Sequence, residues 1–150
     1  DAVILRTAWV YGVHGHNFVR TMLRLAAEGR PLRVVADQTG SPTWARDIAG
    51  SIMALMQAGA SGLYHYTSAG SVSWCGFASA ILSEAMKAGF ELRTQTVEPI
   101  TTAEYPTPAR RPAYSVLDTG KIEAELGLSI PPWRDRLVTM LGELYRCETS

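Results

Sequence analysis

Short apolar runs alternate with segments of helical periodicity along the chain, and this alternation limits the folds open to it. Residues 2–5 are a continuous apolar run of strand length, and residues 32–36 and 63–66 are interpreted as two further strands. Between the first two, Phe18 and Met22 begin a stripe of apolar residues at i, i+4 and i+7, which indicates an amphipathic helix. Strands that alternate with helices build βα units with a mainly parallel sheet. We therefore expect an α/β fold.

Capping residues predict where several helices begin and end. Asn17 and Ser73 are of the type that caps a helix N-terminus, and Gly29 and Gly89 of the type that ends a helix. The pair at 41–42, Ser-Pro, predicts a further helix start, with proline at the first helical position.

The last third of the chain predicts less regular structure. Residues 91–97 alternate weakly in polarity and are interpreted as an edge strand, whereas residues 98–112 carry four prolines and predict a long extended connection. A short helix is expected to begin at Asp118 or Thr119, and a final amphipathic helix after the Pro-Trp pair at 132–133.

Composition excludes several functional classes. Fourteen basic and fourteen acidic residues give no net charge, so we expect neither a nucleic acid nor an anionic membrane as partner. The apolar stretches are too short to span a bilayer, and residues 1–5 lack the charged start of a signal peptide. Cys75 and Cys147 form no metal or redox spacing, which favours a reduced, cytoplasmic protein.

In the Tyr-x-x-x-Lys motif of short-chain reductases, a lysine ammonium lowers the pKa of a tyrosine phenol one helical turn away. The chain contains two lysines, so the motif can be sought at two positions. Ser83 precedes Lys87 by four residues, and Leu117 precedes Lys121, so the pair is absent. The glycines within residues 12–15 follow a strand, but a third glycine and an acidic partner are missing, so this segment is either a tight turn or a phosphate cradle. We expect no catalytic residues in this chain.

Seven segments carry a further pattern: residues 6–12, 17–18, 22–25, 34–43, 47–49, 111–118 and 132–133. In this order and spacing they resemble the dTDP-4-dehydrorhamnose reductase family, whose members are extended short-chain dehydrogenases. The resemblance covers nearly the whole chain. It implies that residues 1–150 are the C-terminal part of a Rossmann-like extended short-chain dehydrogenase with a small substrate-binding α/β subdomain. The cofactor-binding N-terminal part, with its glycine-rich loop and Tyr-x-x-x-Lys, would then lie outside this chain.

The resemblance also implies a function. The family reduces the 4-keto group of dTDP-4-dehydro-L-rhamnose with NADPH or NADH, giving dTDP-L-rhamnose for cell-surface polysaccharide. This chain would be the substrate-binding half, inactive alone, with a nucleotide sugar as its ligand and a homodimer as a possible assembly. Two alternatives remain open: a non-catalytic subunit similar to the regulatory subunit of methionine adenosyltransferase, and a free-standing nucleotide-sugar binding module.

Four residues are candidates for substrate binding. Trp9 follows the first strand, at the edge of the sheet where ligands bind, and the matching tryptophan of the family contacts the deoxysugar nucleotide; the alternative is a core tryptophan. Asn17 either donates to the ligand or only caps its helix, and Gln38 either lines the sugar pocket or only completes a turn. Arg111, or Arg110 beside it, is a hypothesis for binding the diphosphate, because a guanidinium suits a phosphate; both arginines could instead be solvated.

Other residues in the same segments have simpler interpretations. Thr43 is considered with Gln38 as a possible pocket residue. Trp44, Trp74 and Trp133 stand at predicted helix starts, where we expect them to pack beneath the cap.

A metal ion is doubtful in this chain. Some members of the family hold magnesium at a dimer interface through glutamates, and Arg46 stands where one of these carboxylates would follow the Pro-Thr turn. Glu143 could match another ligand, but one carboxylate is not a site. His14 and His16 have no acidic or cysteine partner nearby in sequence, so a metal is not expected there either.

Overall fold

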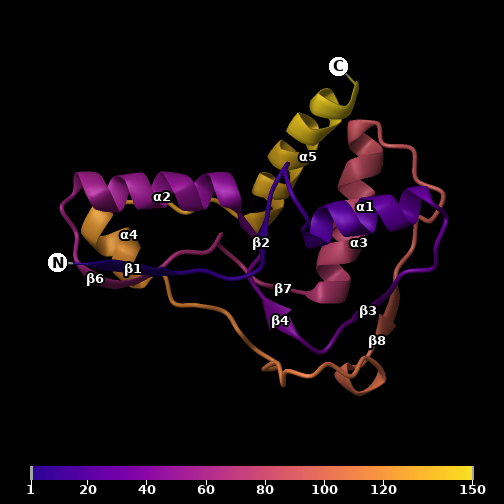
Figure 1. Cartoon of the computed structure of the whole chain (residues 1–150), viewed down its shortest axis with the longest axis horizontal. Coiled ribbons are helices and arrows are strands. Elements are labelled where there is room, and N and C mark those ends of the chain that lie inside the picture. The colour runs from indigo at the N-terminus through magenta and orange to yellow at the C-terminus, as the bar shows by residue number, and fades with distance from the viewer. Residues whose placement is uncertain (1, 150) are drawn as a thin grey trace.

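The computed structural model describes residues 2–149, which form two lobes, each around its own hydrophobic cluster (Figure 1). The first lobe contains β1, β6, α2 and α4, and the second contains α1, α3, α5, β3 and β8. The strands are β1 (Val3–Arg6), β2 (Val10–Tyr11), β3 (Arg33–Val35), β4 (Thr39–Gly40), β5 (Thr43–Trp44), β6 (Gly62–His65), β7 (Val72–Ser73) and β8 (Glu98–Ile100). The helices are α1 (Phe18–Ala27), α2 (Ala45–Gln57), α3 (Trp74–Ala88), α4 (Gly120–Leu126) and α5 (Trp133–Thr149), with a 3₁₀ turn, η1 (Thr102–Glu104).

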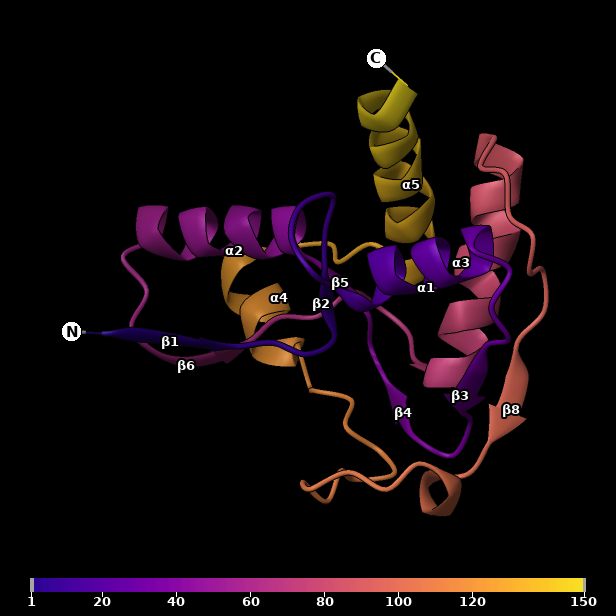
Figure 2. The same cartoon turned by 45° about the vertical axis from the view of Figure 1, so that its right-hand side comes forward.

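Strand pairing is mainly parallel, as the alternation of strands and helices predicts. β1 pairs with β6, β2 with β5 and β3 with β8, all in parallel, and β4 pairs with β7 in antiparallel orientation. Within residues 2–149 these are four separate two-stranded sheets. The extended connection after β8 returns from the second lobe to α4 in the first (Figures 1 and 2).

Local capping chemistry fixes the helices of the second lobe. The Asn17 side chain accepts a hydrogen bond from the Arg20 amide at 3.3 Å, and Ser73 Oγ accepts one from the Gly76 amide at 3.0 Å. Gly89 ends α3 in the left-handed conformation, with φ at 106°. These boundaries confirm the sequence predictions, and α1, α3 and α5 then pack around one buried cluster.

Two predicted elements are wrong, and both errors have local physical reasons. Ser41 does not cap a helix: its hydroxyl donates to the Gly70 carbonyl at 2.7 Å, and α2 begins three residues after Pro42. Residues 91–97 form no strand; the amides of Arg93 and Thr94 both donate to the Ala26 carbonyl instead. The strand lies instead at β8, in the first three residues of the predicted connection 98–112. It pairs with β3 although it contains a proline, because an edge strand tolerates proline.

The first lobe leaves apolar side chains exposed. Ile4 in β1 is 58% exposed and Met56 in α2 is 68% exposed, and Val3, Met53 and Leu63 are exposed as well. Parallel strands are normally covered on both faces, so this part of the lobe has an apolar surface that residues 2–149 do not cover.

Candidate functional site

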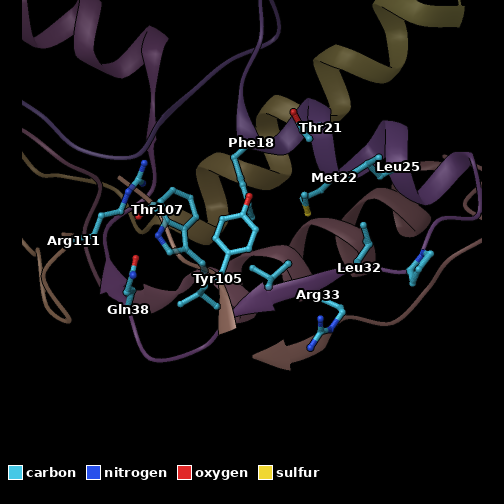
Figure 3. Close-up of a pocket in the computed structure, with 14 residues that line it drawn as sticks. Phe18, Thr21, Met22, Leu25, Leu32, Arg33, Gln38, Tyr105, Thr107 and Arg111 are labelled. Atoms are coloured by element: carbon cyan, nitrogen blue, oxygen red, sulfur yellow. The ribbon is translucent and has the colours of Figure 1, made fainter. Parts of the chain in front are cut away.

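A cavity of about 430 Å³ opens in the second lobe, between α1, β3, the start of α3 and the segment after η1 (Figure 3). It is the candidate binding pocket, because it is concave, mainly apolar, and carries a few polar groups. The lining residues are Phe18, Thr21, Met22, Leu25, Pro31, Leu32, Arg33, Val34, Val35, Gln38, Trp74, Tyr105, Thr107 and Arg111.

The polar and apolar parts of the pocket lie apart. Figure 3 shows Gln38 and Arg111 on one side of the Tyr105 ring, and Met22 and Leu25 on the other. The Arg111 guanidinium and the Gln38 amide suit an anionic group of a ligand. The apolar side suits a flat or aliphatic group of the same ligand. The pocket is therefore shaped for a ligand that carries both.

A hydrogen-bond network holds Gln38 in place. Its amide nitrogen donates to Thr102 Oγ1 at 3.1 Å, and that hydroxyl donates to Asp37 Oδ1 at 2.7 Å. The Thr102 amide also donates to the Asp37 carboxylate, at 2.9 Å and 3.0 Å to its two oxygens. The hydrogen bonds from the Thr102 side chain and backbone lower the pKa of Asp37. Asp37 therefore joins the turn that carries Gln38 to the η1 segment.

The same segment presents Tyr105 to the pocket. Glu104 accepts hydrogen bonds from the Thr101 amide and hydroxyl, which lower its pKa, and Arg33 lies 3.4 Å from the same carboxylate. Tyr105 follows directly and is 59% exposed at the mouth of the pocket. It was missed by the sequence analysis, because a tyrosine in a proline-rich connection gives no local signal of a binding site.

Trp9 and Trp74 form a stacked pair at the pocket. Their ring centroids lie 3.5 Å apart with an interplanar angle of 11°, and Phe18 lies against Trp74 at 4.7 Å. Trp74 lines the pocket, and Trp9 stacks against the face of its indole. Trp74 therefore has a place in the site, in addition to packing at the start of α3 as the sequence predicted.

Asn17 uses its side chain within the loop that precedes α1. Its amide nitrogen donates to the Gly12 carbonyl at 2.9 Å and to the His14 carbonyl at 3.4 Å. Arg20 Nη1 donates to the Val13 carbonyl at 2.6 Å. The loop thus turns three carbonyls toward its own side-chain donors, an arrangement that does not suit a phosphate and favours the tight turn.

Thr43 lies outside the pocket lining. It is completely buried, and its hydroxyl donates to the Ser41 carbonyl at 3.1 Å. Of the residues predicted to bind ligand, the structure places Gln38 and Arg111 in one pocket, Trp9 behind its wall, and Asn17 next to the lining residue Phe18. Arg110 is exposed and does not line the pocket.

Neither lysine belongs to the pocket. Lys87 Nζ pairs with Glu84 at 3.1 Å, and Lys121 Nζ lies 3.9 Å from the centroid of the Tyr64 ring. No lysine is among the residues that line the described cavity. An acid and a cofactor clamp of the Tyr-x-x-x-Lys type are therefore not supplied by this pocket.

A partly buried ion pair joins the start of α2 to α5. Arg136 Nε lies 3.1 Å from Asp47 Oδ2, although neither atom makes an aligned hydrogen bond within residues 2–149. Burial raises the pKa of Asp47, and Arg136 opposes that shift. Burial is also the main cause that raises the pKa of Tyr66 to about 12 and raises that of Tyr11. The Asp47–Arg136 pair therefore joins α2 to α5.

The described residues offer neither a metal centre nor a membrane span. Between residues 2 and 149 no group of three or more His, Cys, Asp or Glu side chains is gathered as a metal ion requires. Arg46, in the position of the expected carboxylate, pairs with Glu143 and lies 4.7 Å from the Trp44 ring centroid. Across the same stretch, every helix is too short or too polar to cross a membrane.

A family model that covers nearly the whole chain identifies its family. Residues 1–146 match the model of the RmlD substrate binding domain. The chain is 48% identical over 145 residues to a dTDP-4-dehydrorhamnose reductase of Burkholderia thailandensis, an alignment that covers 89% of this chain and 49% of that protein. The chain spans about half the length of the curated relatives it matches.

Solved structures show the same likeness. A crystal structure of dTDP-4-dehydrorhamnose reductase from Bacillus anthracis in complex with NADP is 38% identical, with a TM-score of 0.86, and the match covers 94% of this chain and 48% of that one. A dTDP-glucose 4,6-dehydratase of the same organism, in complex with NAD, is 13% identical with a TM-score of 0.74, over 97% of this chain and 44% of that one. This second likeness concerns the fold alone, which is the α/β fold of the Rossmann-like extended short-chain dehydrogenases.

Proposed function

The chain belongs to the family of the RmlD substrate binding domain, and from this premise we propose that it is the substrate-binding half of a reductase. The reductase converts dTDP-4-dehydro-L-rhamnose into dTDP-L-rhamnose with NADPH or NADH. The observation that carries the proposal is the pocket that combines Arg111 and Gln38 with the aromatic surface of Tyr105 and Trp74. The reductase names of the relatives favour this function over that of a regulatory subunit.

The two parts of the pocket suit the two parts of a nucleotide sugar. The Arg111 guanidinium would bind the diphosphate, since its planar donors match phosphate oxygens. Tyr105 and Trp74 would contact flat or apolar parts of the ligand. Gln38 would donate to or accept from the sugar or the base, and Trp9 would contact the deoxysugar with the part of its indole that Trp74 leaves open. Asn17 would reach the ligand only after releasing the carbonyls it now binds.

The cofactor and the catalytic pair belong to another half of the reductase. The loop at residues 12–15 does not suit a phosphate, and the sequence lacks Tyr-x-x-x-Lys; both observations support the proposal that hydride and proton transfer depend on residues outside this chain. The exposed apolar side chains of the first lobe, among them Ile4 and Met56, supply a surface on which such a half would pack. NADPH or NADH would be bound mainly by that other half of the reductase.

Two further proposals concern assembly and location. We place the reductase in the cytoplasm, because Cys75 and Cys147 are both free thiols and free thiols persist in reducing compartments. We also propose that the reductase forms a homodimer. Magnesium would not link the two copies, because Glu143 is paired with Arg46 and is not free to bind a metal ion.

The test is the oxidation of NADPH by the full-length protein that carries this chain, followed by absorbance. We expect oxidation only when the 4-keto sugar nucleotide is present. A regulatory subunit or a binding module would not oxidise NADPH under either condition. Trp9→Ala should raise KM or lower turnover strongly, and an unchanged kcat/KM would remove Trp9 from the site.

A further inference from the structure

Trp9 has a backbone conformation that a tryptophan rarely adopts. Its φ is 48°, and it is the one non-glycine residue with positive φ in the described part of the chain. Such a conformation is unfavourable for a residue with a side chain and persists only where the surroundings enforce it, often at binding sites. One contact that holds the Trp9 backbone in this conformation is a hydrogen bond from the Thr43 amide to the Trp9 carbonyl, at 3.1 Å.

Gly40 in β4 leaves the space that the Trp9 indole fills. A Cβ atom added to Gly40 would lie 2.4 Å from Trp9 Cε2 and 2.6 Å from Nε1. Both distances are far shorter than a van der Waals contact. Gly40 is not among the glycines with positive φ, so its backbone conformation does not require glycine. The close approach of the Trp9 indole is what requires glycine at this position.

The position of Trp9 in turn supports Trp74. The two indoles stack at 3.5 Å, and Trp74 lines the pocket. β4 pairs with β7 through Gly40 and Val72, and the Trp74 amide donates to the Gln38 carbonyl at 3.3 Å. The strand that makes room for Trp9 is therefore the strand that places Trp74 beside Gln38.

We propose that Trp74 is a specificity-determining residue that contacts the nucleotide sugar, and that Gly40 is a positioning residue, because it admits the Trp9 indole that holds Trp74 in the pocket wall. This inference rests on the proposed function, because it names the residues that shape the same pocket. It assigns to Gly40 the role of admitting the indole of Trp9, and to the Trp9–Trp74 stack the role of presenting one rigid aromatic surface to the ligand.

Gly40→Ala in the full-length protein tests the inference, with Gly50→Ala as the matched control. A Cβ at Gly50 meets no atom within 4 Å, so the control should behave as wild type. Gly40→Ala should displace the Trp9 indole and with it Trp74. We expect KM for the sugar nucleotide to rise about fivefold or more, by loss of an aromatic stacking contact. KM for NADPH and kcat should change little.

A spectroscopic readout reports the stack itself. Two indoles whose ring centroids lie 3.5 Å apart couple electronically, and the coupling gives a paired circular dichroism band where their transition dipoles are not parallel. We expect Gly40→Ala to abolish this band and Gly50→Ala to keep it. In the background Trp9→Ala, the substitution Gly40→Ala should add little to KM, because the clash no longer exists. Trp74→Phe should raise KM even where Gly40→Ala does not fold.

The outcomes separate this inference from the proposed function. A wild-type protein that does not oxidise NADPH with the sugar nucleotide overturns the proposed function and the ligand named here. An active wild type in which Gly40→Ala or Trp74→Phe leaves KM unchanged overturns the inference alone. Retention of the paired band in Gly40→Ala, or full additivity of Trp9→Ala and Gly40→Ala, overturns the positioning role of Gly40.

Discussion

Replacing Tyr105 by alanine should separate ligand affinity from stability. The side chain is 59% exposed at the pocket mouth and packs little against the core, so its loss should change the free energy of unfolding by less than about 0.5 kcal/mol. A tyrosine side chain has a surface area of roughly 200 Å², so 59% exposure leaves about 120 Å² of the Tyr105 surface open to a ligand. If the ligand covers half of that area, at about 25 cal/mol per Å² the contact is worth about 1.5 kcal/mol, or roughly a tenfold increase in KM.

The assay compares KM for the sugar nucleotide with the midpoint of chemical denaturation in the full-length protein. Tyr114→Ala is the control, because Tyr114 is 66% exposed but does not line the pocket. The expected result is a tenfold rise in KM for Tyr105→Ala alone, with both midpoints near that of wild type. Equal KM values for the two variants would refute the placement of the ligand against Tyr105.

Three further predictions concern stability. Leu141→Ala should lower the free energy of unfolding by about 2–5 kcal/mol, because Leu141 is completely buried; Val138→Ala on the same helix, where the side chain is exposed, should cost far less in a denaturation series. Because the pKa of Asp37 is lowered in the folded protein, its carboxylate stabilises fully above its unfolded pKa of about 4. That stability is lost as pH falls through the folded pKa, so the difference between wild type and Asp37→Asn should vanish in acid, and a difference that persists there would contradict the network. Because Arg46 pairs with Glu143, magnesium and EDTA should both leave the melting temperature unchanged; a rise with magnesium would indicate a metal site.

Elements set by local chemistry could be predicted from the sequence. Asn17 and Ser73 cap their helices through hydrogen bonds to amides three residues away, and Gly89 ends α3 in a left-handed conformation. Such signals depend on a few neighbouring residues. The Ser41 hydroxyl instead bonds to a residue 29 positions away, which no local pattern reveals.

The candidate site was predicted in part for the same reason. Gln38 and Arg111 follow from the segments that resemble the family, and both line the pocket. Trp74 reaches the pocket only because β4 pairs with β7, and Tyr105 only because Thr102 binds Asp37 across 65 positions of sequence. These contacts join distant segments, so the sequence alone could not place the aromatic part of the pocket.

Binding of dTDP to the full-length protein, measured by titration calorimetry, tests whether this pocket is the nucleotide-sugar site. Arg111 lines the pocket and its exposed neighbour Arg110 does not, which makes Arg110→Ala a matched control. Arg111→Ala should weaken binding by about tenfold or more, since hydrogen bonds to a charged group are worth about 1.5–3 kcal/mol, and Arg110→Ala should bind as wild type. Wild-type affinity in Arg111→Ala, or a larger loss in Arg110→Ala, would contradict the assignment.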